Sequence, residues 1–353
     1  MKLSVVVCTY NYGHLLPDAL RSLAAQLATD FELVIVDDGS TDNTEEVAEQ
    51  FRPQFQDFRY LKNTHTGPAD SRNAGVRAAR GTHIAFLDAD DLWSPHYVSE
   101  IGQVLSTHPQ AELVLCEAII VRSKNQMITE VALHRELPAL CRVVHSPADI
   151  FGVVQAFSPS GMVFSRDLYH RAGPFNVETF GWFSEDVDWV FRALEAEAFC
   201  ICLKQRLYLY RRHGDNLTEK AGDSFRSWLA LYSGTLKDSR KDPRIEALAR
   251  GIIRSRAWRF LPTCSTSEGR FLLKRAIATL GGEPLIRLYY IGTFLGLVGL
   301  LKILKQFRQI LRGMLRKKLA IDLSSSSESV FAAANDQLLK PVADGRTSGR
   351  LPG

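Results

Sequence analysis

The first half of this 353-residue sequence predicts an α/β fold, with a Rossmann-like, mostly parallel sheet flanked by helices. Short apolar runs alternate with segments of helical periodicity from residue 3 to residue 121. Two of these runs, residues 34–36 and 84–87, are apolar without alternation, which is typical of strands buried on both faces. Strand, helix and strand in repetition indicate parallel strands joined by right-handed crossovers. After about residue 216 the sequence becomes helical and basic, so we expect a helical C-terminal region to follow the sheet.

The expected elements of the first half follow from these patterns in order. Strands are expected at residues 3–8, 33–36, 58–62, 84–87 and 113–121, and helices at 14–26, 41–51, 69–79 and 95–107. In the first helix, four leucines between residues 15 and 23 recur at helical spacing. Ser40 or Thr41 is expected to cap the second helix, with Glu45 in its first turn.

The pattern is less regular from residue 130 onward. Residues 158–165 predict a loop that leads into a short strand, and residues 166–173 predict a helix ended by Gly-Pro. A longer helix that begins with acidic residues is expected at 182–198. Residues 200–210 are rich in aromatic residues and predict a strand pair or an edge strand.

Composition and charge limit the class of protein. Apolar residues make up 46% of the chain and charged residues 23%, as in an ordinary globular protein. The formal net charge of +4 is small for this length, so we expect no nucleic-acid partner. The six cysteines lie mostly in apolar runs and predict reduced, buried thiols in a cytoplasmic protein. The N-terminal apolar stretch is too short for a signal peptide and is better explained as the first strand.

The C-terminal region contains an apolar stretch followed by a basic one. Residues 288–301 form a run of 14 uncharged residues, whereas a spanning helix needs about 20. Residues 302–318 predict an amphipathic helix with a basic face. This combination favours peripheral contact with the inner face of a membrane; the alternative is a helical cap packed on the sheet domain. Residues 321–353 lack a hydrophobic period and predict a disordered tail.

Two buried strands end abruptly in acidic residues. Asp37 and Asp38 follow the first, and Asp88, Asp90 and Asp91 follow the second. The carboxyl ends of parallel strands meet at one crevice, so these carboxylates repel one another unless a cation or hydrogen-bond donors lie among them. Carboxylate oxygens suit Mg²⁺ or Mn²⁺. A metal beside a nucleotide-like crevice indicates diphosphate chemistry, whereas the alternative is an acidic turn that caps the next helix.

The other candidate residues have structural alternatives as well. The Asp-Gly-Ser-Thr-Asp segment forms a good turn without any ligand, so Asp37 or Asp42 can be structural while Asp38 faces a ligand. Arg72 can reach a phosphate with its planar donor fork, or it can be an exposed helical arginine. His213 is a candidate metal ligand or phosphate contact, although a lone histidine is more often neither.

Asp186 lies in the acidic segment FSEDVDW and is a candidate general base. For that role it must lie within hydrogen-bond reach of an acceptor hydroxyl. Acidic residues at a helix start also gain from the backbone dipole, so the alternative is an N-terminal acidic turn.

In order along the chain, the motifs are SVVVCTYNYGHLLPDALRSL, VIVDDGSTDNT, ARGTHIAFLDADDLW, SEDVDW and YRRHGDNLT. This ordered set resembles family 2 glycosyltransferases, which are inverting enzymes of the GT-A fold. The resemblance covers residues 1–218. It implies a nucleotide-sugar-binding and catalytic domain at 1–218. Beyond it, the composition predicts a helical, basic region with membrane-surface contact at 219–320 and the tail at 321–353. The sequence lacks the Q-x-x-R-W motif of processive synthases, which favours transfer of a single sugar.

The resemblance also implies roles for particular residues. The site residues that it implies for the nucleotide sugar are Thr9, Tyr10, Asn11, Asp38, Arg72 and Asp88. Arg72 belongs near the diphosphate, although Ser71 stands where the family motif usually has alanine. Asp90 is implied as the direct ligand of Mn²⁺ or Mg²⁺, with His213 on the metal and diphosphate side. Asp186 is implied as the catalytic base.

The implied reaction moves a sugar from a nucleoside-diphosphate sugar to a hydroxyl of a saccharide or lipid-linked saccharide, in polysaccharide or glycoconjugate synthesis. Two alternatives stay open. A sugar-1-phosphate nucleotidyltransferase would need a glycine-rich, basic loop after the first strand, where this sequence has CTYNYGHL. A non-catalytic nucleotide-sugar-binding module would not need the acidic residues of both DADD and SEDVD.

Overall fold

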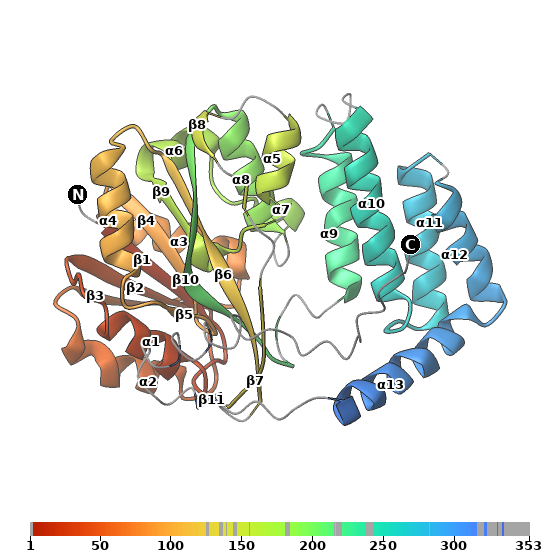
Figure 1. The fold of residues 1–353 in the computed structure, drawn as a ribbon, viewed down its shortest axis with the longest axis horizontal. Helices are drawn as coiled ribbons and strands as arrows, with labels where there is room; N and C mark the ends of the chain where they lie inside the picture. Colours follow the sequence, from red (N-terminus) through yellow and green to blue (C-terminus); the bar gives the residue numbers. More distant parts are fainter. Residues whose placement is uncertain are drawn as a thin grey trace, which may run out of the picture.

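Among the residues that it describes, the computed structural model contains an eleven-stranded sheet and a row of C-terminal helices (Figure 1). It describes residues 3–124, 127–133, 137–138, 140–143, 147–154, 156–180, 184–214, 216, 221–237, 243–281, 283–315, 321–322, 330 and 334. Of the tail predicted at 321–353, most lies outside the described residues.

Four parallel strands form the first part of the sheet. In spatial order they are β3 (Phe58–Lys62), β2 (Phe31–Asp37), β1 (Leu3–Thr9) and β4 (His83–Asp88). The register puts Thr9 opposite Asp37 and Cys8 opposite Asp88. The acidic residues that follow β2 and β4 therefore lie at the same edge, on either side of β1, as the sequence predicts.

Helices cover both faces of this part of the sheet. On one face lie α1 (Leu16–Ala24), α2 (Thr44–Phe51, followed by η1, Arg52–Gln54) and α4 (Tyr97–Thr107), which share one hydrophobic core with the sheet. On the other face lie α3 (Pro68–Ala78), α5 (Pro147–Val154), α6 (Arg166–Ala172) and α8 (Glu185–Glu195), packed in a second core. Successive residues of β1 alternate between the two cores, with Val5 in the first and Val6 in the second.

The second part of the sheet combines the strands predicted at 113–121 and within 158–165, which are β6 and β9, with others that the sequence did not predict. It consists of β5 (Leu92–Trp93), β6 (Leu113–Lys124), β7 (Met127–Leu133), β8 (Cys141–Val143), β9 (Met162–Ser165), β10 (Phe199–Arg212) and β11 (Ile321–Asp322). The expectation of a strand pair or edge at 200–210 is wrong. β10 is one long strand that pairs in parallel with β6 and antiparallel with β5 and β8. Its interior position explains the apolar and aromatic residues.

The start of α2 and the end of α8 each lie three residues from the predicted boundary. α2 begins at Thr44 after Asn43, not after Ser40 or Thr41. Ser40 instead accepts a hydrogen bond on Oγ from the Asn11 N–H (2.8 Å), and the Thr41 N–H donates to Asn11 Oδ1 (2.8 Å). α8 ends at Glu195 rather than at residue 198, because Glu197 takes a positive φ of 59° on the way into β10. Residues 182–183 of the predicted helix lie outside the described residues.

The expectation that the cysteines are buried is wrong for Cys141, which is exposed on β8.

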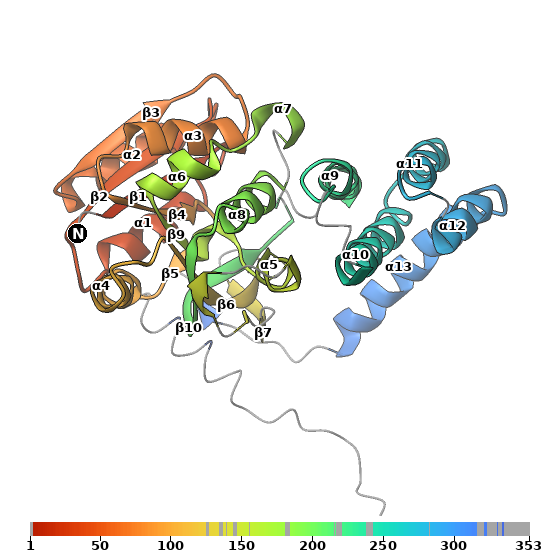
Figure 2. The ribbon, with the colours of Figure 1, turned by 90° about the horizontal axis from the view of Figure 1, so that it is seen from above.

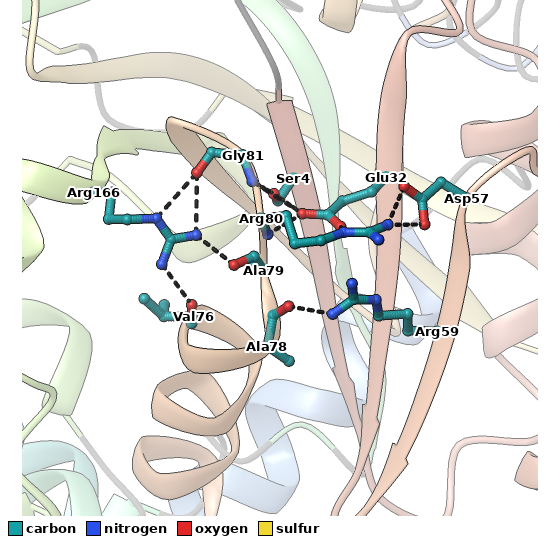
Figure 3. Close-up of polar contacts among 10 residues, drawn as sticks. All are labelled: Ser4, Glu32, Asp57, Arg59, Val76, Ala78, Ala79, Arg80, Gly81 and Arg166. Carbon is teal, nitrogen blue, oxygen red and sulfur yellow. Dashed lines mark hydrogen bonds and ion pairs between the residues drawn. The ribbon is translucent and has the colours of Figure 1, made fainter.

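A polar cluster holds the turn between α3 and β4 (Figure 3). The buried carboxylate of Glu32, at the start of β2, accepts hydrogen bonds from the Ser4 hydroxyl, the Arg80 N–H and the Gly81 N–H. Arg166 donates to the carbonyl oxygens of residues 76, 79 and 81. Burial alone would raise the pKa of Glu32, but these hydrogen bonds lower it. The cluster fixes the start of β4, the strand that delivers Asp88 at its other end.

The C-terminal region is helical, as expected. It contains α9 (Ala221–Ser233), α10 (Pro243–Phe260), α11 (Thr266–Thr279), α12 (Pro284–Phe294) and α13 (Leu297–Leu315). In Figures 1 and 2, α9 lies nearest to the sheet and α11 and α12 lie farthest from it. Phe225 of α9 and Leu272 of α11 belong to the same hydrophobic core as Trp189 of α8, and the short α7 (Val177–Phe180) lies next to α9.

α12 and α13 meet at a sharp bend. Within the described residues, no one helix has both the length and the apolar composition for a membrane span. The two segments Pro284–Phe294 and Leu297–Gln306 meet that requirement only together, with a bend of 93° between them. The side chains of residues 307–318, which the sequence assigns to the basic amphipathic helix, lie outside the described part.

Candidate active site

Three carboxylates gather where β4 ends. Asp88, Asp90 and Asp91 each offer an oxygen within 4.8 Å of the others. Asp91 is fully buried; its carboxylate accepts hydrogen bonds from Ser160 Oγ (2.6 Å) and from the Arg211 N–H (2.8 Å). Asp91 therefore fixes the acidic loop against η2 (Pro159–Gly161) and β10. Asp88 and Asp90 remain the oxygen donors on the accessible side, with 28% and 13% of their side chains exposed.

The electrostatics of the cluster fit a cation. Burial raises the pKa of Asp88 to about 6, and the negative charges of Asp90 and Asp186 act in the same direction, while Arg72 opposes them. Burial also raises the pKa of Asp91 well above its ordinary value, with further contributions from Asp90 and Asp88. Carboxylates that repel one another in this way gain when a divalent cation lies among them. The all-oxygen donor set matches the preference of Mg²⁺ and Mn²⁺.

Asp90 is joined to the loop that follows β10. Its Oδ2 lies 3.0 Å from His213 Nε2 and accepts a hydrogen bond from Asn216 Nδ2 at 2.9 Å. Asn216 also fixes the loop, because its Oδ1 accepts from the His213 N–H at 2.5 Å. The structure thus brings together Asp90 and His213, which lie 123 residues apart in the sequence. Sequence reasoning missed Asn216 as a partner of Asp90; the signal was its place three residues after His213.

Arg72 links α3 to both β4 and α8. It is 6% exposed, so the alternative of an exposed helical arginine is wrong. Its Nη2 donates to Asp88 Oδ1 (3.1 Å), and its Nη1 forms an ion pair with Glu185. Arg72 Nε is buried and lacks a hydrogen-bond partner within the described part of the chain. Glu185 is a site residue that the sequence analysis did not single out, although the acidic first turn of α8 contains it.

Asp186 follows Glu185 in the first turn of α8 and is only partly buried. One carboxylate oxygen accepts a hydrogen bond from the Val187 N–H (2.8 Å). Burial alone would lower the pKa of Arg72, but the negative charges of Asp88 and Asp186 raise it. Burial raises the pKa of Asp88, and the charge of Asp186 adds to this rise while Arg72 opposes it. The carboxylate therefore lies near the Arg72–Asp88 pair.

The opposite side of the site consists of the segments that follow β1 and β2, together with the loop that contains residues 65–67. Asp38 is buried, and its two carboxylate oxygens accept hydrogen bonds from the N–H groups of Thr66 and Gly67, both at 2.9 Å. The ring of Tyr10 stacks on His65, with centroids 3.9 Å apart and an angle of 23° between the planes. Asp38 thus holds the loop that carries His65, and the stacked rings form a flat surface beside it.

The end of β1 lies between the two groups. Thr9 Oγ1 is buried and has no hydrogen-bond partner among the described residues. Asn11 takes a positive φ of 54°, a conformation that asparagine tolerates better than most residues. Burial raises the pKa of Cys8 to about 12, and the charges of Arg72, Asp88 and Asp38 all act on this thiol. These three charged residues therefore surround the end of β1.

Asp37 and Asp42 have structural roles, which is one of the alternatives that the sequence left open for this segment. Asp37 accepts hydrogen bonds from the Ser40 N–H (2.8 Å) and from the Tyr60 hydroxyl (2.5 Å). Asp42 accepts hydrogen bonds from the Gly13 N–H (3.0 Å) and the Thr44 N–H (3.1 Å). Their carboxylates hold the turn between β2 and α2.

Comparison with known proteins shows what this sequence is similar to. Residues 4–168 match the family model "Glycosyl transferase family 2". A relative from Nostoc sp., the uncharacterized glycosyltransferase alr2836, is 32% identical over 225 residues, which cover 61% of this chain and 66% of the relative. A PGL/p-HBAD biosynthesis glycosyltransferase of Mycobacterium tuberculosis is 37% identical over 124 residues, or 35% of this chain and 48% of the relative. The chain thus spans 66% of the length of the first relative and 48% of the length of the second.

Two solved structures share the fold. Residues 1–349 of Staphylococcus aureus TarS, in complex with UDP-GlcNAc, superpose with a TM-score of 0.59 and 20% identity, covering 88% of this chain and 92% of that one. The mannosyltransferase PcManGT of Pyrobaculum calidifontis, in complex with GDP-Man and Mn²⁺, has a TM-score of 0.51 and 18% identity, covering 96% of this chain and 87% of that one. At these identities the likeness concerns the fold alone, and it confirms the expected GT-A architecture.

Proposed function

Because the chain belongs to glycosyltransferase family 2, we propose that it is an inverting enzyme that moves a sugar from a nucleoside-diphosphate sugar to an acceptor hydroxyl. The observation that carries this proposal is the buried Arg72, which pairs with Asp88 on β4 and with Glu185 on α8. This pairing keeps the acidic residues after β4 next to Asp186, as a reaction between a bound diphosphate and an acceptor requires.

The donor would bind across the ends of β1 and β2. The Tyr10–His65 stack offers a flat surface for a base, and Asp38 offers carboxylate oxygens beside it. Thr9 ends β1, and Asn11 follows it beside Ser40 and Thr41. At the acidic cluster, Arg72 can offer its unpaired Nε to the diphosphate side. TarS in complex with UDP-GlcNAc and PcManGT in complex with GDP-Man share this fold, which supports a nucleotide-sugar ligand.

A divalent cation would be held by Asp90, with Asp88 and His213 beside it. The complex of PcManGT with Mn²⁺ supports this choice. A bound Mn²⁺ or Mg²⁺ would offset the negative charge that develops on the departing diphosphate. Asn216 and His213 would orient the Asp90 carboxylate through the contacts already described.

The chain's own residues would then perform a single displacement. Asp186 accepts the proton of the acceptor hydroxyl, and the hydroxyl oxygen forms a bond to the anomeric carbon. The bond between that carbon and the diphosphate oxygen breaks, and its electron pair leaves with the diphosphate. Attack from the opposite face inverts the anomeric configuration. Arg72, fixed by Glu185, keeps the reacting groups in place.

The acceptor is proposed to be a saccharide or a lipid-linked saccharide in polysaccharide or glycoconjugate synthesis. The name of the Mycobacterium relative, which refers to PGL/p-HBAD biosynthesis, supports such a role.

We also propose that α12 and α13 contact the cytoplasmic face of an anionic membrane. Residues 284–321 contain eight lysines and arginines and no acidic residue. Several large apolar side chains of this pair are exposed: Leu288, Ile291, Phe294, Leu295, Leu300, Ile303 and Leu304. Basic and apolar groups together suit an anionic lipid surface.

Product analysis tests the reaction. The full chain is incubated with nucleotide sugars, with Mn²⁺ or with EDTA, and the released phosphates are identified. A glycosyltransferase releases a nucleoside diphosphate in the Mn²⁺ sample, even slowly with water as acceptor. A nucleotidyltransferase would release pyrophosphate from a nucleoside triphosphate and a sugar phosphate. Binding of a nucleotide sugar without any release would contradict the proposal and favour a binding module.

A further inference from the structure

A cleft opens beside the proposed cation site, between the ends of β6, β7 and β10. Its volume is about 290 Å³, and its lining residues are Arg122, Ser123, Thr129, Arg212, His213 and Gly214. His213 lies between the cleft and Asp90, because its Nε2 contacts the Asp90 carboxylate at 3.0 Å. A ligand in this cleft would therefore be held on the far side of His213 from the acidic cluster.

The two arginines of the cleft are direct neighbours across the sheet. Arg212 of β10 is paired with Arg122 of β6, and Arg122 is paired in turn with Glu130 of β7. Residues paired across two strands point to the same face, about 5 Å apart. Like charges at that spacing are unfavourable unless an opposite charge lies near them. The sheet register thus concentrates positive charge at the mouth of the cleft.

Arg212, Arg122 and Glu130 are paired in one row across β10, β6 and β7. This row contains two guanidinium groups and one carboxylate. Arg122 Nε forms an ion pair with Glu130 Oε2 at 3.1 Å. Arg212 has no ion pair within the described residues; its guanidinium lies over the ring of Tyr210, 5.9 Å from the centroid. The simpler explanation, a cross-strand ion pair on the surface, accounts for Arg122 and Glu130 but not for a second arginine set opposite the first.

We propose that the Arg122–Arg212 cleft binds a phosphoryl group of the acceptor. This inference rests on the proposed transferase function, because it names the chemistry of that reaction's second substrate. Two guanidinium forks can each donate paired hydrogen bonds to phosphate oxygens, a geometry that an ammonium group lacks. The donor diphosphate is assigned elsewhere, between Arg72 and Asp90, so the cleft holds a separate anion. The phosphoryl group can come from a lipid-linked diphosphate or from a soluble sugar phosphate.

Calorimetric titration of the full chain with inorganic pyrophosphate tests the site. EDTA is present throughout, so that no divalent cation supports binding at the donor site. We compare the wild type with the double variant Arg122→Gln/Arg212→Gln and with the control Arg52→Gln/Arg171→Gln. The control removes the same charge from exposed, ion-paired arginines elsewhere. Wild type and control should bind alike, and the double variant should bind at least tenfold more weakly. Equal affinity in all three proteins would overturn the proposal.

Two further measurements keep the result interpretable. Arg122→Lys/Arg212→Lys retains the charge but loses the planar forks, so its affinity should lie between those of the wild type and the glutamine variant. This variant replaces the glutamine pair if the latter does not fold. A separate competition titration, with Mn²⁺ in place of EDTA, adds saturating UDP so that the donor site is filled. Unchanged pyrophosphate affinity supports a separate site, whereas a proportional loss of affinity would assign the anion to the donor site and overturn the proposal.

The source of the phosphoryl group is determined in two parallel arms. One uses glucose 1-phosphate in solution, and the other uses zwitterionic vesicles that contain a polyprenyl diphosphate. Arginine-dependent binding in either arm supports the proposal and identifies the source; its absence in both arms overturns it. None of these titrations requires sugar transfer. Failure here therefore leaves the proposed function intact, and failure of that function is detected by its own product analysis.

Discussion

Asp186 is the residue whose replacement best separates chemistry from binding. Its carboxylate lies near the Arg72–Asp88 pair, whereas the ion pair that fixes Arg72 belongs to Glu185. Asp186→Asn should therefore lower the rate of transfer by about 10²–10⁴-fold, the usual contribution of a general base. Affinity for the nucleotide sugar, measured by calorimetry with Mn²⁺, should stay close to that of the wild type. The matched control is Glu178→Gln, another acidic residue in the first turn of a helix. Full activity of the Asp186 variant would refute its role.

Asp90 should determine how strongly the donor depends on metal. It is one of three carboxylates in the cluster and the one that His213 and Asn216 orient. Asp90→Ala should weaken the Mn²⁺-dependent part of nucleotide-sugar binding by at least about tenfold, because even indirect metal partners contribute that much. Binding in EDTA should change little. The exposed Asp30→Ala serves as control. If Mn²⁺ enhances binding equally in the wild type and in the Asp90 variant, the cation is held elsewhere.

The sequence motifs identified some site residues and missed others, and the contacts of the individual residues explain why. Asp88, Asp90, Asp186 and Arg72 belong to local patterns that the sequence displays directly. The partners that position them lie far away in the chain. Glu185 meets Arg72 across 113 residues, and Asn216 meets Asp90 across 126. No local pattern encodes such a contact, so these partners emerge only when the sheet is assembled.

At the scale of elements, the turn from α3 into β4 depends on one buried carboxylate. Glu32 accepts several hydrogen bonds that Glu32→Gln cannot all accept, because the amide group has a donor where the carboxylate has an acceptor. The variant should lose about 1–3 kcal/mol of unfolding free energy at pH 7, measured by urea denaturation. The exposed Glu46→Gln should lose almost none.

The pH dependence of this difference follows from the sign of the pKa shift. Hydrogen bonding lowers the pKa of Glu32 in the folded protein despite its burial. The stability that its charge contributes is therefore complete above the unfolded pKa of about 4.3 and is lost as the pH falls through the lower, folded value. The gap between wild type and Glu32→Gln should close on acidification. A gap that stays constant down to pH 3 would contradict this explanation.

Elements whose periodicity is local were predictable, and those defined by distant partners were not. β1 to β4 and α1 to α4 appear in the expected places, because each displays its own apolar pattern. β5 contains only Leu92 and Trp93, and it exists because Leu209 and Tyr208 of β10 pair with them. Two residues have no period to detect. The interior position of β10 was likewise invisible until β6 and β8 were placed on its sides.

For the molecule as a whole, the C-terminal helices should determine whether the protein binds to a membrane surface. Full-length protein should sediment with vesicles of anionic lipid but only weakly with zwitterionic vesicles. Lys302→Glu/Lys305→Glu, on the exposed side of α13, should reduce the partition coefficient at least tenfold, since each basic residue contributes about 1 kcal/mol near an anionic surface. Lys274→Glu/Arg275→Glu on α11 makes the same change in charge outside the α12–α13 pair. Equal sedimentation with both kinds of vesicle, or with neither, would contradict membrane contact.

β10 consists of two halves that should differ in their tolerance of inserted or deleted residues. Its ladder with β6 shifts register between Leu203 and Arg206 and again between Arg206 and Tyr208, and from Tyr208 to Arg212 it runs without interruption. Among homologues, insertions and deletions of single residues should accumulate at positions 203–207, where irregular pairing can absorb them. Beyond Tyr208 the same change would turn every following side chain to the opposite face and carry His213 away from Asp90.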